Sequence, residues 1–454
     1  MRFGQQSTDM TTGSISGRIV GFAAPLFLGY VCQQLYSTVD AVVVGNFVGQ
    51  EALAAVGSSN APINLLIGFF MGLAVGAGVV ISRRFGEKDE QGVSRAVHTT
   101  VLFGLIISVL LTAAGVALTP ALLRLMGTPE DVLPNSILYF RIYFYGILTV
   151  VMYNIGSSIF RAMGDSVRPL LYLIVSSILN VALDLLFVCT FNMGIAGAAW
   201  ATVISQGVSM VMTFARLMRV SEAHRLDLKK LRIHRAELRE IVGIGLPNGV
   251  QASIVSLSNV VVQSNINSFG AAAMAGCGAC GRIDGFAGIP VTCFMMAAMT
   301  FVSQNLGAKQ YGRAKKGARF SLIAAVATSE LIGAVLFIFA PQLISLFNAD
   351  PEVVAYGAQY TRDISLVYCL LAVSHVVSGI LRGAGISKVP MYVTVACWCG
   401  LRMLWISLTV PMFRNIRFVY FGYPLTWACS AIILLIIYKK LDWQHAYERR
   451  PAHL

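Results

Sequence analysis

The chain has 454 residues, of which 56% are hydrophobic and 12% are charged, and its formal net charge at pH 7 is +13. Soluble domains carry about 25% charged residues, so this composition excludes an ordinary soluble protein. The positive charge alone would suit a nucleic-acid-binding protein, but the basic residues are spread between hydrophobic segments, and no nucleic-acid partner is expected.

Hydrophobic segments recur along the chain, and each reaches the roughly 20 apolar residues that a helix needs to cross a bilayer. The first span continues through Pro25 without a small-residue cleavage site, so we expect a retained helix and not a signal peptide. The prediction is an all-α polytopic membrane protein with twelve transmembrane helices. In chain order, the spans are expected near residues 17–44, 52–82, 96–119, 136–158, 169–191, 195–218, 240–268, 271–303, 318–341, 357–380, 389–411 and 418–438.

Lys and Arg residues are distributed unevenly between the two predicted sides of the membrane. With the N-terminus inside, most of them fall in cytoplasmic segments, whereas the external loops hold Arg124, Arg414 and Arg417. This asymmetry follows the positive-inside rule. It predicts a multi-pass protein of the cell (inner) membrane with both termini cytoplasmic.

The second half of the chain repeats the first at an offset of about 221 residues, a period that indicates duplication of a whole domain. For example, residues 48–57 align with 269–278, and residues 160–164 align with 381–385. Since six spans return the chain to its starting side, the halves are expected to be parallel repeats related by an axis along the membrane normal. Transporters show this arrangement.

The predicted domains follow from this repeat. Residues 1–218 form an N-lobe with transmembrane helices 1 to 6, and residues 240–438 form a C-lobe with helices 7 to 12. Residues 219–239 form a cytoplasmic amphipathic linker and residues 439–454 a cytoplasmic tail. The linker alternates Leu with basic residues, so it is expected to lie along the anionic membrane surface, and a merely solvated connector is the alternative.

Two acids, Asp40 and Asp184, lie inside predicted spans 1 and 5. A charged side chain at the bilayer centre costs about 3 kcal/mol on insertion scales, so an acid there suggests a function. Further polar residues follow at helical spacing and form stripes in spans 1, 4, 5 and 6. They are Gln33, Tyr36, Asn154, Ser158, Ser176, Asn180, Thr202 and Gln206. The stripes predict one polar cavity in the N-lobe, with hydrogen bonding between helices as the alternative for the amides and hydroxyls.

The positions that correspond to Asp40 and Asp184 in the second half are Val261 and Trp405, so only the first half carries these acids. Burial and a neighbouring acid both favour the protonated form of a carboxyl group and couple the two titrations. We therefore expect the two acids to bind a proton and to release it when the cavity opens or a cation arrives.

The second half contains intramembrane charges of its own. They are Arg282, Asp284, Glu330, Asp363 and Arg402. Arg282 and Asp284 are expected to pair with neighbours such as Glu330 or Arg402. Alternatively, they face the cleft between the lobes, where Arg402 would attract an anionic substrate group. The same cavity would include Met295 and Met299, which are otherwise plain core, and His375 is expected to be a hydrogen-bonded packing residue.

Pro25 and Pro247 lie at matching places in spans 1 and 7. Each removes a backbone hydrogen bond, so each is predicted to kink its helix. Bending of span 1 near Asp40 would link protonation to the shape of the cavity. The nine cysteines lie almost wholly in apolar spans without metal-ligand spacing, so inert thiols and no metal site are expected.

Several blocks of the first half resemble the MATE (multidrug and toxic compound extrusion) family, and the chain is most similar to its DinF-like prokaryotic branch. The blocks are residues 33–40, 48–49, 52–57, Gly86 and residues 161–165. The resemblance implies the MATE fold and a secondary antiporter that exchanges protons or sodium ions for cationic or amphipathic drugs. It also implies that Asp40, Asn180, Asp184 and Thr202 are the ion-coupling residues. NorM-type relatives carry second-lobe acids where residues 248–269 and 365–380 of this chain have none, which argues against a second-lobe sodium site. The choice between proton and sodium stays open at the first lobe, where we expect the proton.

The predicted function is export of small molecules by alternating access, by a monomer without enzymatic activity or cofactor. Alternatives from the same superfamily are a lipid-linked oligosaccharide flippase, which would need a strongly basic cleft, and a dedicated metabolite exporter. An intramembrane aspartyl protease would need Tyr-Asp and Gly-x-Gly-Asp, where this chain has Val39-Asp40 and Leu183-Asp184. No phosphate-binding loop, HExxH motif or nucleophile elbow occurs, which disfavours ATP-driven pumping and hydrolysis.

Overall fold

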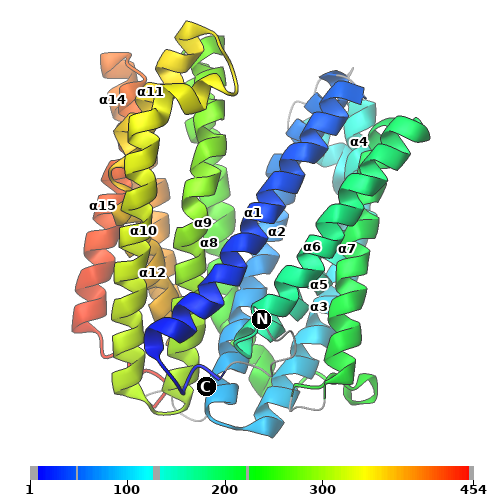
Figure 1. The fold of residues 1–454 in the computed structure, drawn as a ribbon, viewed down its shortest axis with the longest axis vertical. Coiled ribbons are helices and arrows are strands. Elements are labelled where there is room, and N and C mark those ends of the chain that lie inside the picture. Colours follow the sequence, from blue (N-terminus) through cyan, green and yellow to red (C-terminus); the bar gives the residue numbers. More distant parts are fainter. Residues whose placement is uncertain (1–8, 48–49, 126–132, 221–223, 449–454) are drawn as a thin grey trace. The chain divides into compact units, whose positions relative to one another are not determined.

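The structure is a computed structural model that describes residues 9–47, 50–125, 133–220 and 224–448, without the side chains of residues 37, 39–47, 50–67, 122 and 125. The described residues form helices and no strands, which confirms the predicted fold class (Figure 1). The first half contains α1 (Ile15–Phe47), α2 (Gln50–Gly86), α3 (Glu90–Leu125), α4 (Leu133–Tyr145), α5 (Ile147–Ala162), α6 (Val167–Asp184), the π-helix η1 (Leu185–Thr190), α7 (Gly194–Arg219) and the 3-10 turn η2 (Leu228–Lys230).

The second half follows the same plan. It contains α8 (Arg235–Asn267), α9 (Ala271–Gly307), α10 (Tyr311–Ser345), α11 (Pro351–Ser365), α12 (Tyr368–Gly383), α13 (Lys388–Thr394), the π-helix η3 (Val395–Leu401), α14 (Arg402–Phe413) and α15 (Arg417–Lys440).

Ten helices of the described chain are long and apolar enough to cross a membrane, and two bent helix pairs bring the number of candidate spans to twelve. The bent pairs are α4 with α5, at 45°, and α11 with α12, at 55°. They correspond to spans 4 and 10 of the prediction, so each repeat has its break in the same span. A break inside a membrane exposes backbone groups that other parts of the protein must satisfy.

The described chain divides into two compact units that each contain one repeat apart from a short segment. Unit 1 comprises Asp9 and residues 28–246, and unit 2 comprises residues 10–27 and 247–448. The predicted lobes differ from these units in two segments, because the first part of α1 belongs to unit 2 and the first part of α8, residues 235–246, belongs to unit 1. Sequence similarity could not show this, since it follows from which helix each segment packs against.

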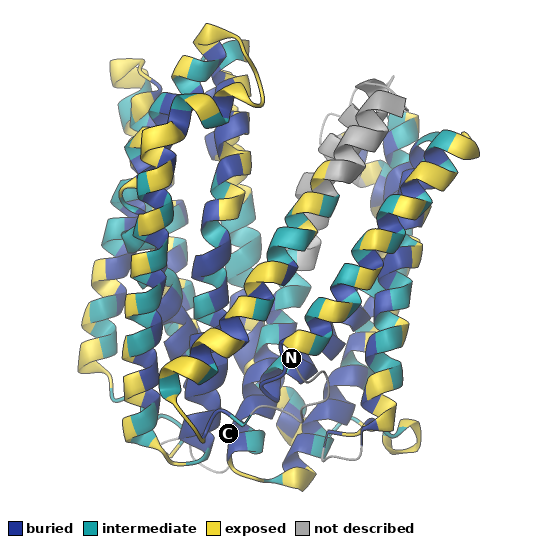
Figure 2. Ribbon diagram, in the orientation of Figure 1, coloured by how far each residue is buried: buried dark blue, intermediate teal, exposed yellow. Residues whose placement is uncertain are grey.

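In unit 1, α5 packs against α2, α3 and α7, and α6 packs against α7. In unit 2, α9 packs against α10, α11 and α12, and α15 closes the bundle against α12 and α14. Buried residues line the inside of each bundle and exposed residues its outside (Figure 2). The exposed positions on α3, α6, α10 and α14 are largely hydrophobic, as expected for helices that face lipid.

Candidate functional site

The polar stripes of spans 5 and 6 meet along one seam between α6 and α7. The hydroxyl of Ser176 donates to the carbonyl oxygen of Ser205 at 3.0 Å, and the hydroxyl of Ser209 donates to that of Tyr172 at 3.0 Å. These two bonds fix the register of two antiparallel helices. Asn180 and Asp184 follow Ser176 on α6 at intervals of four residues, so they continue the same face of that helix.

Both predicted coupling residues of α6 are deeply buried. Asn180 is 2% exposed and Asp184 is 0% exposed. The side-chain oxygen and nitrogen of Asn180 make no hydrogen bond within the described part of the chain. Leaving a buried amide unsatisfied costs about 1–3 kcal/mol, and native proteins rarely keep such a group without a reason. The unsatisfied amide makes this seam a candidate for a polar ligand site, although hydroxyl hydrogen bonds also join its two helices.

The helix changes its geometry at the acid. α6 ends at Asp184, and the following residues, Leu185 to Thr190, form the π-helix η1. A π-helical turn contains an extra residue and shifts the backbone hydrogen bonds, and such turns occur frequently at functional sites. The change in geometry at a buried carboxylate marks this part of span 5 as a candidate site.

The other predicted N-lobe residues lie near this seam or on neighbouring helices. The hydroxyl of Thr202 donates to the carbonyl oxygen of Ala198 in its own helix at 3.2 Å. Gln206 is buried on α7, and its side-chain oxygen has no hydrogen-bond donor among the described residues. Gln33 is exposed and Tyr36 is half-buried on α1. Asp40 lies in α1 as well, but its side chain is outside the described part of the structure.

Asn154 and Ser158 of α5 serve different purposes. The hydroxyl of Ser158 donates to the carbonyl oxygen of Ala74 at 2.7 Å and so ties α5 to α2, which is the packing role weighed as the alternative. The amide of Asn154 donates to the carbonyl oxygen of Val150 at 2.9 Å. Asn154 also lines a small, otherwise apolar pocket with residues of α2 such as Phe70 and Ala74.

The acids of unit 2 hold the break between α11 and α12. The hydroxyl of Tyr368 donates to Asp284, and the backbone N–H of Cys369 donates to Glu330 at 2.7 Å. The predicted ion pairs of Arg282 and Asp284 with neighbours such as Glu330 or Arg402 do not form among the described residues, so that prediction is wrong. The reason is the first turn of α12, which supplies both donors, the side-chain hydroxyl of Tyr368 and the free backbone N–H of Cys369. Asp363 forms an ion pair with Arg417 at 2.8 Å.

The remaining predicted residues of unit 2 do not converge. Arg282 is exposed, whereas Arg402 is 2% exposed and its guanidinium donates to the hydroxyl of Thr426 at 3.0 Å. Met299 is buried in the core, and the half-buried Met295 receives a weak hydrogen bond from Arg382. The ring of His375 lies 5.5 Å from that of Trp398, in line with a packing role.

The two prolines lie inside helices that continue through them. Pro25 is half-buried in α1 and Pro247 is buried in α8. The division between the units passes through α1 after residue 27 and through α8 after residue 246. Each proline is therefore at or within three residues of the point where its helix passes from one unit to the other.

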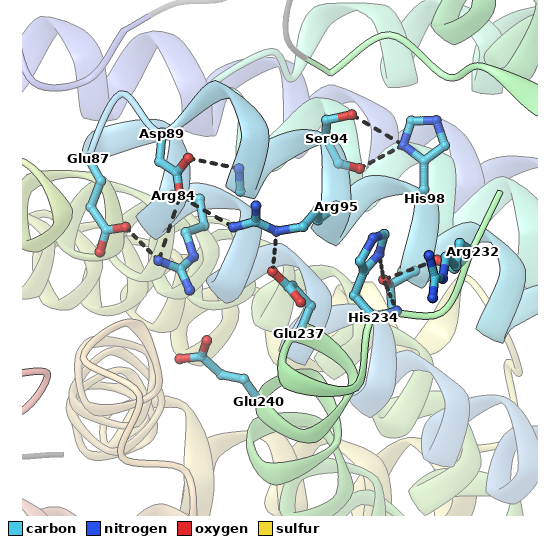
Figure 3. A network of polar contacts seen from close by, with 12 residues as sticks. Arg84, Glu87, Asp89, Ser94, Arg95, His98, Arg232, His234, Glu237 and Glu240 are labelled. Carbon is cyan, nitrogen blue, oxygen red and sulfur yellow. Dashed lines mark hydrogen bonds and ion pairs between the residues drawn. The ribbon is translucent and has the colours of Figure 1, made fainter. Parts of the chain in front are cut away.

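A polar network in unit 1, which we did not predict, joins the turn between α2 and α3 to the start of α8. Arg83 forms a bidentate ion pair with Glu240. Figure 3 shows the neighbouring bond, in which Arg95 donates to Glu237 at 2.8 Å. The spacing of the two acids on one face of α8, just after a basic linker, was a signal for it.

Histidines extend this network into the linker. The side chain of His98 accepts a hydrogen bond from the backbone of Asp227 at 3.1 Å, and the backbone of His234 donates to the hydroxyl of Thr99 at 3.1 Å. Leu226 of the linker is buried. The described part of the linker thus packs against α3 of unit 1 and is not merely a solvated connector.

Comparisons with known proteins agree with this architecture. A family model described as MatE matches residues 25–186 and 247–406, one match in each half of the chain. The chain is 30% identical over 379 residues to the probable multidrug resistance protein YpnP of Bacillus subtilis, covering 83% of this chain and 84% of that protein. It is 28% identical over 364 residues to an FAD transporter of Shewanella oneidensis, covering 78% and 79% of the two chains.

The fold also matches solved structures. A MOP superfamily transporter from Pyrococcus furiosus superposes with a TM-score of 0.91 at 22% identity, over 98% of this chain and 99% of that one. An outward-facing multidrug resistance MATE family transporter gives the same TM-score, identity and coverage. The relatives named here are all described as transporters or multidrug resistance proteins. The chain, a multi-pass membrane protein made of two repeats, therefore belongs to the MATE family of transporters.

Proposed function

We propose that this protein is a secondary active antiporter that exports cationic or amphipathic small molecules in exchange for protons, with sodium as the alternative ion. The family and relatives named as multidrug resistance proteins support the transport of small molecules. The buried pair of Asn180 and Asp184, on one face of α6 at the change from α- to π-helix, carries the proposal for ion coupling. Asp40 and Thr202 complete the proposed coupling site by resemblance.

The mechanism follows from the cost of a buried charge. In a seam without bulk water, the neutral carboxyl group of Asp184 is favoured over the carboxylate. A proton that arrives from outside therefore stabilises the closed seam, and its loss to the inside makes the site anionic and attractive to a cationic substrate. Each ligand shifts the two conformations only through its difference in affinity for them.

The remaining parts of the proposal concern location and assembly. We place the protein in the cell (inner) membrane with both termini cytoplasmic, as a monomer that needs no cofactor. The uneven distribution of Lys and Arg supports this orientation. Thiol labelling of single cysteines placed in the turn between α2 and α3 and in the turn between α14 and α15 would test it, because these turns should react from opposite sides.

Transport into or out of proteoliposomes tests the coupling. Under an imposed pH gradient, Asp184→Asn and Asp40→Asn should each abolish gradient-driven transport of a cationic dye, and a sodium gradient alone should drive none in the wild type. Asp363→Asn is the matched control, because this acid of unit 2 pairs with Arg417 away from the seam. Full gradient-driven transport by both seam variants would contradict the proposal.

A dedicated metabolite exporter is the second candidate. One relative with 28% identity is named an FAD transporter, and the match extends over most of both chains. Competition in the same vesicles separates the two candidates. A multidrug exporter should accept several unrelated cationic dyes, whereas a dedicated exporter should accept one class of metabolite, such as flavin nucleotides, and reject the dyes.

A further inference from the structure

We infer that Arg402 is an anion-binding site inside unit 2, which takes a carboxylate or phosphate group of an aromatic or amphipathic transported molecule. The inference rests on the proposed transport function and adds a substrate class to it. Arg402 lies near the middle of the candidate span Lys388–Phe413 and is 2% exposed. An arginine at the centre of a bilayer is expensive, so its presence points to a function unless a partner neutralises it.

The described neighbours of this guanidinium are neutral groups. It donates to the hydroxyl of Thr426 at 3.0 Å and lies 4.3 Å from the ring centre of Tyr423 and 5.8 Å from that of Trp398. In the described part of unit 2, no carboxylate lies within ion-pair distance of it. Aromatic faces attract a cation but leave its charge in place. Among the described residues, Arg402 is therefore a buried cation without a counter-ion.

The acids of unit 2 that lie in candidate spans are engaged elsewhere. Asp284 accepts from Tyr368, Glu330 accepts from the backbone of Cys369, and Asp363 pairs with Arg417. Two others lie at the start of α11, where Asp350 caps the helix and Glu352 is exposed. The last two lie after α15, where Asp442 contacts His445 and Glu448 contacts Tyr311. The described acids of unit 2 therefore leave no counter-ion for Arg402, and an anion on another molecule would supply one.

The guanidinium also keeps hydrogen-bonding capacity. Its Nε–H is buried and has no acceptor among the described residues. A guanidinium presents its donors as a planar fork that matches the two oxygens of a carboxylate or phosphate. An anion bound there would satisfy a donor whose burial is otherwise unfavourable. The same atoms offer nothing to a cationic substrate, which the positive charge repels.

The surroundings indicate which anions fit. The ring of Tyr423 lies 5.8 Å from that of Trp427 and 6.0 Å from that of Tyr360, so Arg402 adjoins a cluster of aromatic side chains. Aromatic faces favour offset or edge contacts with further rings. An anion attached to an aromatic or amphipathic body matches this environment better than a small hydrated anion.

The two repeats place opposite charges at similar breaks in helix geometry. In unit 1 the acid Asp184 is the last α-helical residue before η1, and in unit 2 Arg402 is the first after η3. Both lie in the fifth span of their repeat, where a π-helical turn interrupts the regular hydrogen bonding. The inference thus assigns ion coupling to the acid of one unit and recognition of substrate charge to the base of the other.

Two xanthene dyes of similar size test the inference, carboxyfluorescein as the anion and rhodamine 6G as the cation. We expect Arg402→Gln to weaken carboxyfluorescein binding to the purified protein about tenfold, the loss of one charge-assisted contact, with rhodamine binding unchanged. Arg402→Lys keeps the charge and should bind the anion with intermediate affinity. Arg417→Gln is the matched control, since this arginine already has an acid partner, and it should change neither affinity.

A structural role for Arg402 predicts a different result. Suppose that Arg402 only packs α14 against α15. Arg402→Gln would then either lower the thermal unfolding temperature together with both dye affinities, or change neither affinity. Either result overturns the inference. Should Arg402→Gln fail to fold, the lysine variant decides, because equal affinities for both dyes in that variant and the wild type contradict an anion site. Fluorescence polarisation measures dye binding in detergent and needs no ion gradient. If the wild type showed no gradient-driven transport, the antiport proposal would be overturned, and this binding result would still stand.

Discussion

Asn180 shows how a single buried side chain can be kept against its cost in stability. Its amide atoms are buried on α6 without a hydrogen bond in the described chain. A leucine at that position would remove the unsatisfied groups and add apolar contacts with α7. The position therefore allows stability and transport to be separated experimentally.

We predict that Asn180→Leu raises the free energy of unfolding by about 1–3 kcal/mol, because a buried unpaired amide is removed. The same variant should lose proton-driven transport. Thermal unfolding in detergent measures the first effect and dye efflux from proteoliposomes the second. Ser177→Leu is the control on the same helix, since its hydroxyl is already bonded to the carbonyl oxygen of Leu173. A destabilised Asn180→Leu variant with normal transport would contradict this account.

The residues of this seam were largely predictable from the sequence. Asn180 and Asp184 lie one helical turn apart in a hydrophobic span, so their common face follows from the helical period. The partners of Asp284 and Glu330 were not predictable, because the donors appear only where the helix of span 10 breaks. Nothing in the local sequence of residues 365–368 shows that the break would expose a backbone N–H to α10.

At the scale of elements, the break between α11 and α12 depends on side chains from other helices. The backbone N–H of Cys369 is one of the donors that the start of α12 leaves without an intrahelical acceptor. Glu330 of α10 accepts it at 2.7 Å. The bend of 55° in span 10 is therefore stabilised across helices.

Replacing Glu330 by leucine should lower the free energy of unfolding by about 1–3 kcal/mol, because the part-buried backbone N–H of Cys369 loses its acceptor. Glu330→Gln keeps an acceptor oxygen and should lose less. Glu352→Gln is the control, because this acid is exposed in the first turn of α11. Chemical or thermal unfolding in detergent measures all three, and equal stabilities of the Glu330→Leu variant and the wild type would show that Glu330 does not cap α12.

Two glycines test how closely α2 and α8 approach each other in unit 1. A Cβ atom on Gly76 would lie 2.4 Å from the carbonyl oxygen of Ile241 and 2.6 Å from the backbone nitrogen of Gly245. Backbone atoms cannot move aside as a flexible side chain can. Gly243 lies on α8 between Ile241 and Gly245, and a Cβ atom on it meets nothing within 4 Å.

Gly76→Ala should therefore destabilise the protein by about 1–3 kcal/mol through overpacking. Gly243→Ala should be neutral or stabilising by up to about 1 kcal/mol, because alanine is the better helix former. Thermal unfolding of the two variants side by side provides the measurement. The prediction fails if both variants have the same stability.

At the scale of the whole molecule, α1 and α8 are the two helices that belong to both units. Residues 235–246 of α8 are fixed to unit 1 by the ion pairs of Glu237 and Glu240, and residues 10–14 are fixed to unit 2, where Arg313 donates to the carbonyl oxygens of Met10 and Gly13. The sequence showed both prolines and the repeat, but it could not show these attachments, because they depend on contacts between distant segments.

A change of conformation between the units has to pass through these two helices. Proline weakens a helix by removing a hydrogen bond, so Pro25→Ala and Pro247→Ala should stiffen the shared helices and slow transport while insertion and stability stay intact. Pro341→Ala is the control, because α10 lies wholly in unit 2. Initial rates of dye efflux give the measurement, and wild-type rates in both shared-helix variants would remove prolines as the points of bending.

The start of α1 belongs to unit 2 and the start of α8 belongs to unit 1, and this exchange bears on how the repeat arose. The segment of α1 that joins unit 2 and the segment of α8 that joins unit 1 occupy matching positions in the two repeats. If a single repeat once existed as a separate chain, each copy would have donated its opening segment to the other, as in a domain-swapped dimer. Fusion of the two genes would then have converted the exchange of opening segments between two subunits into an exchange within one chain. The linker would be the segment that joined the two copies.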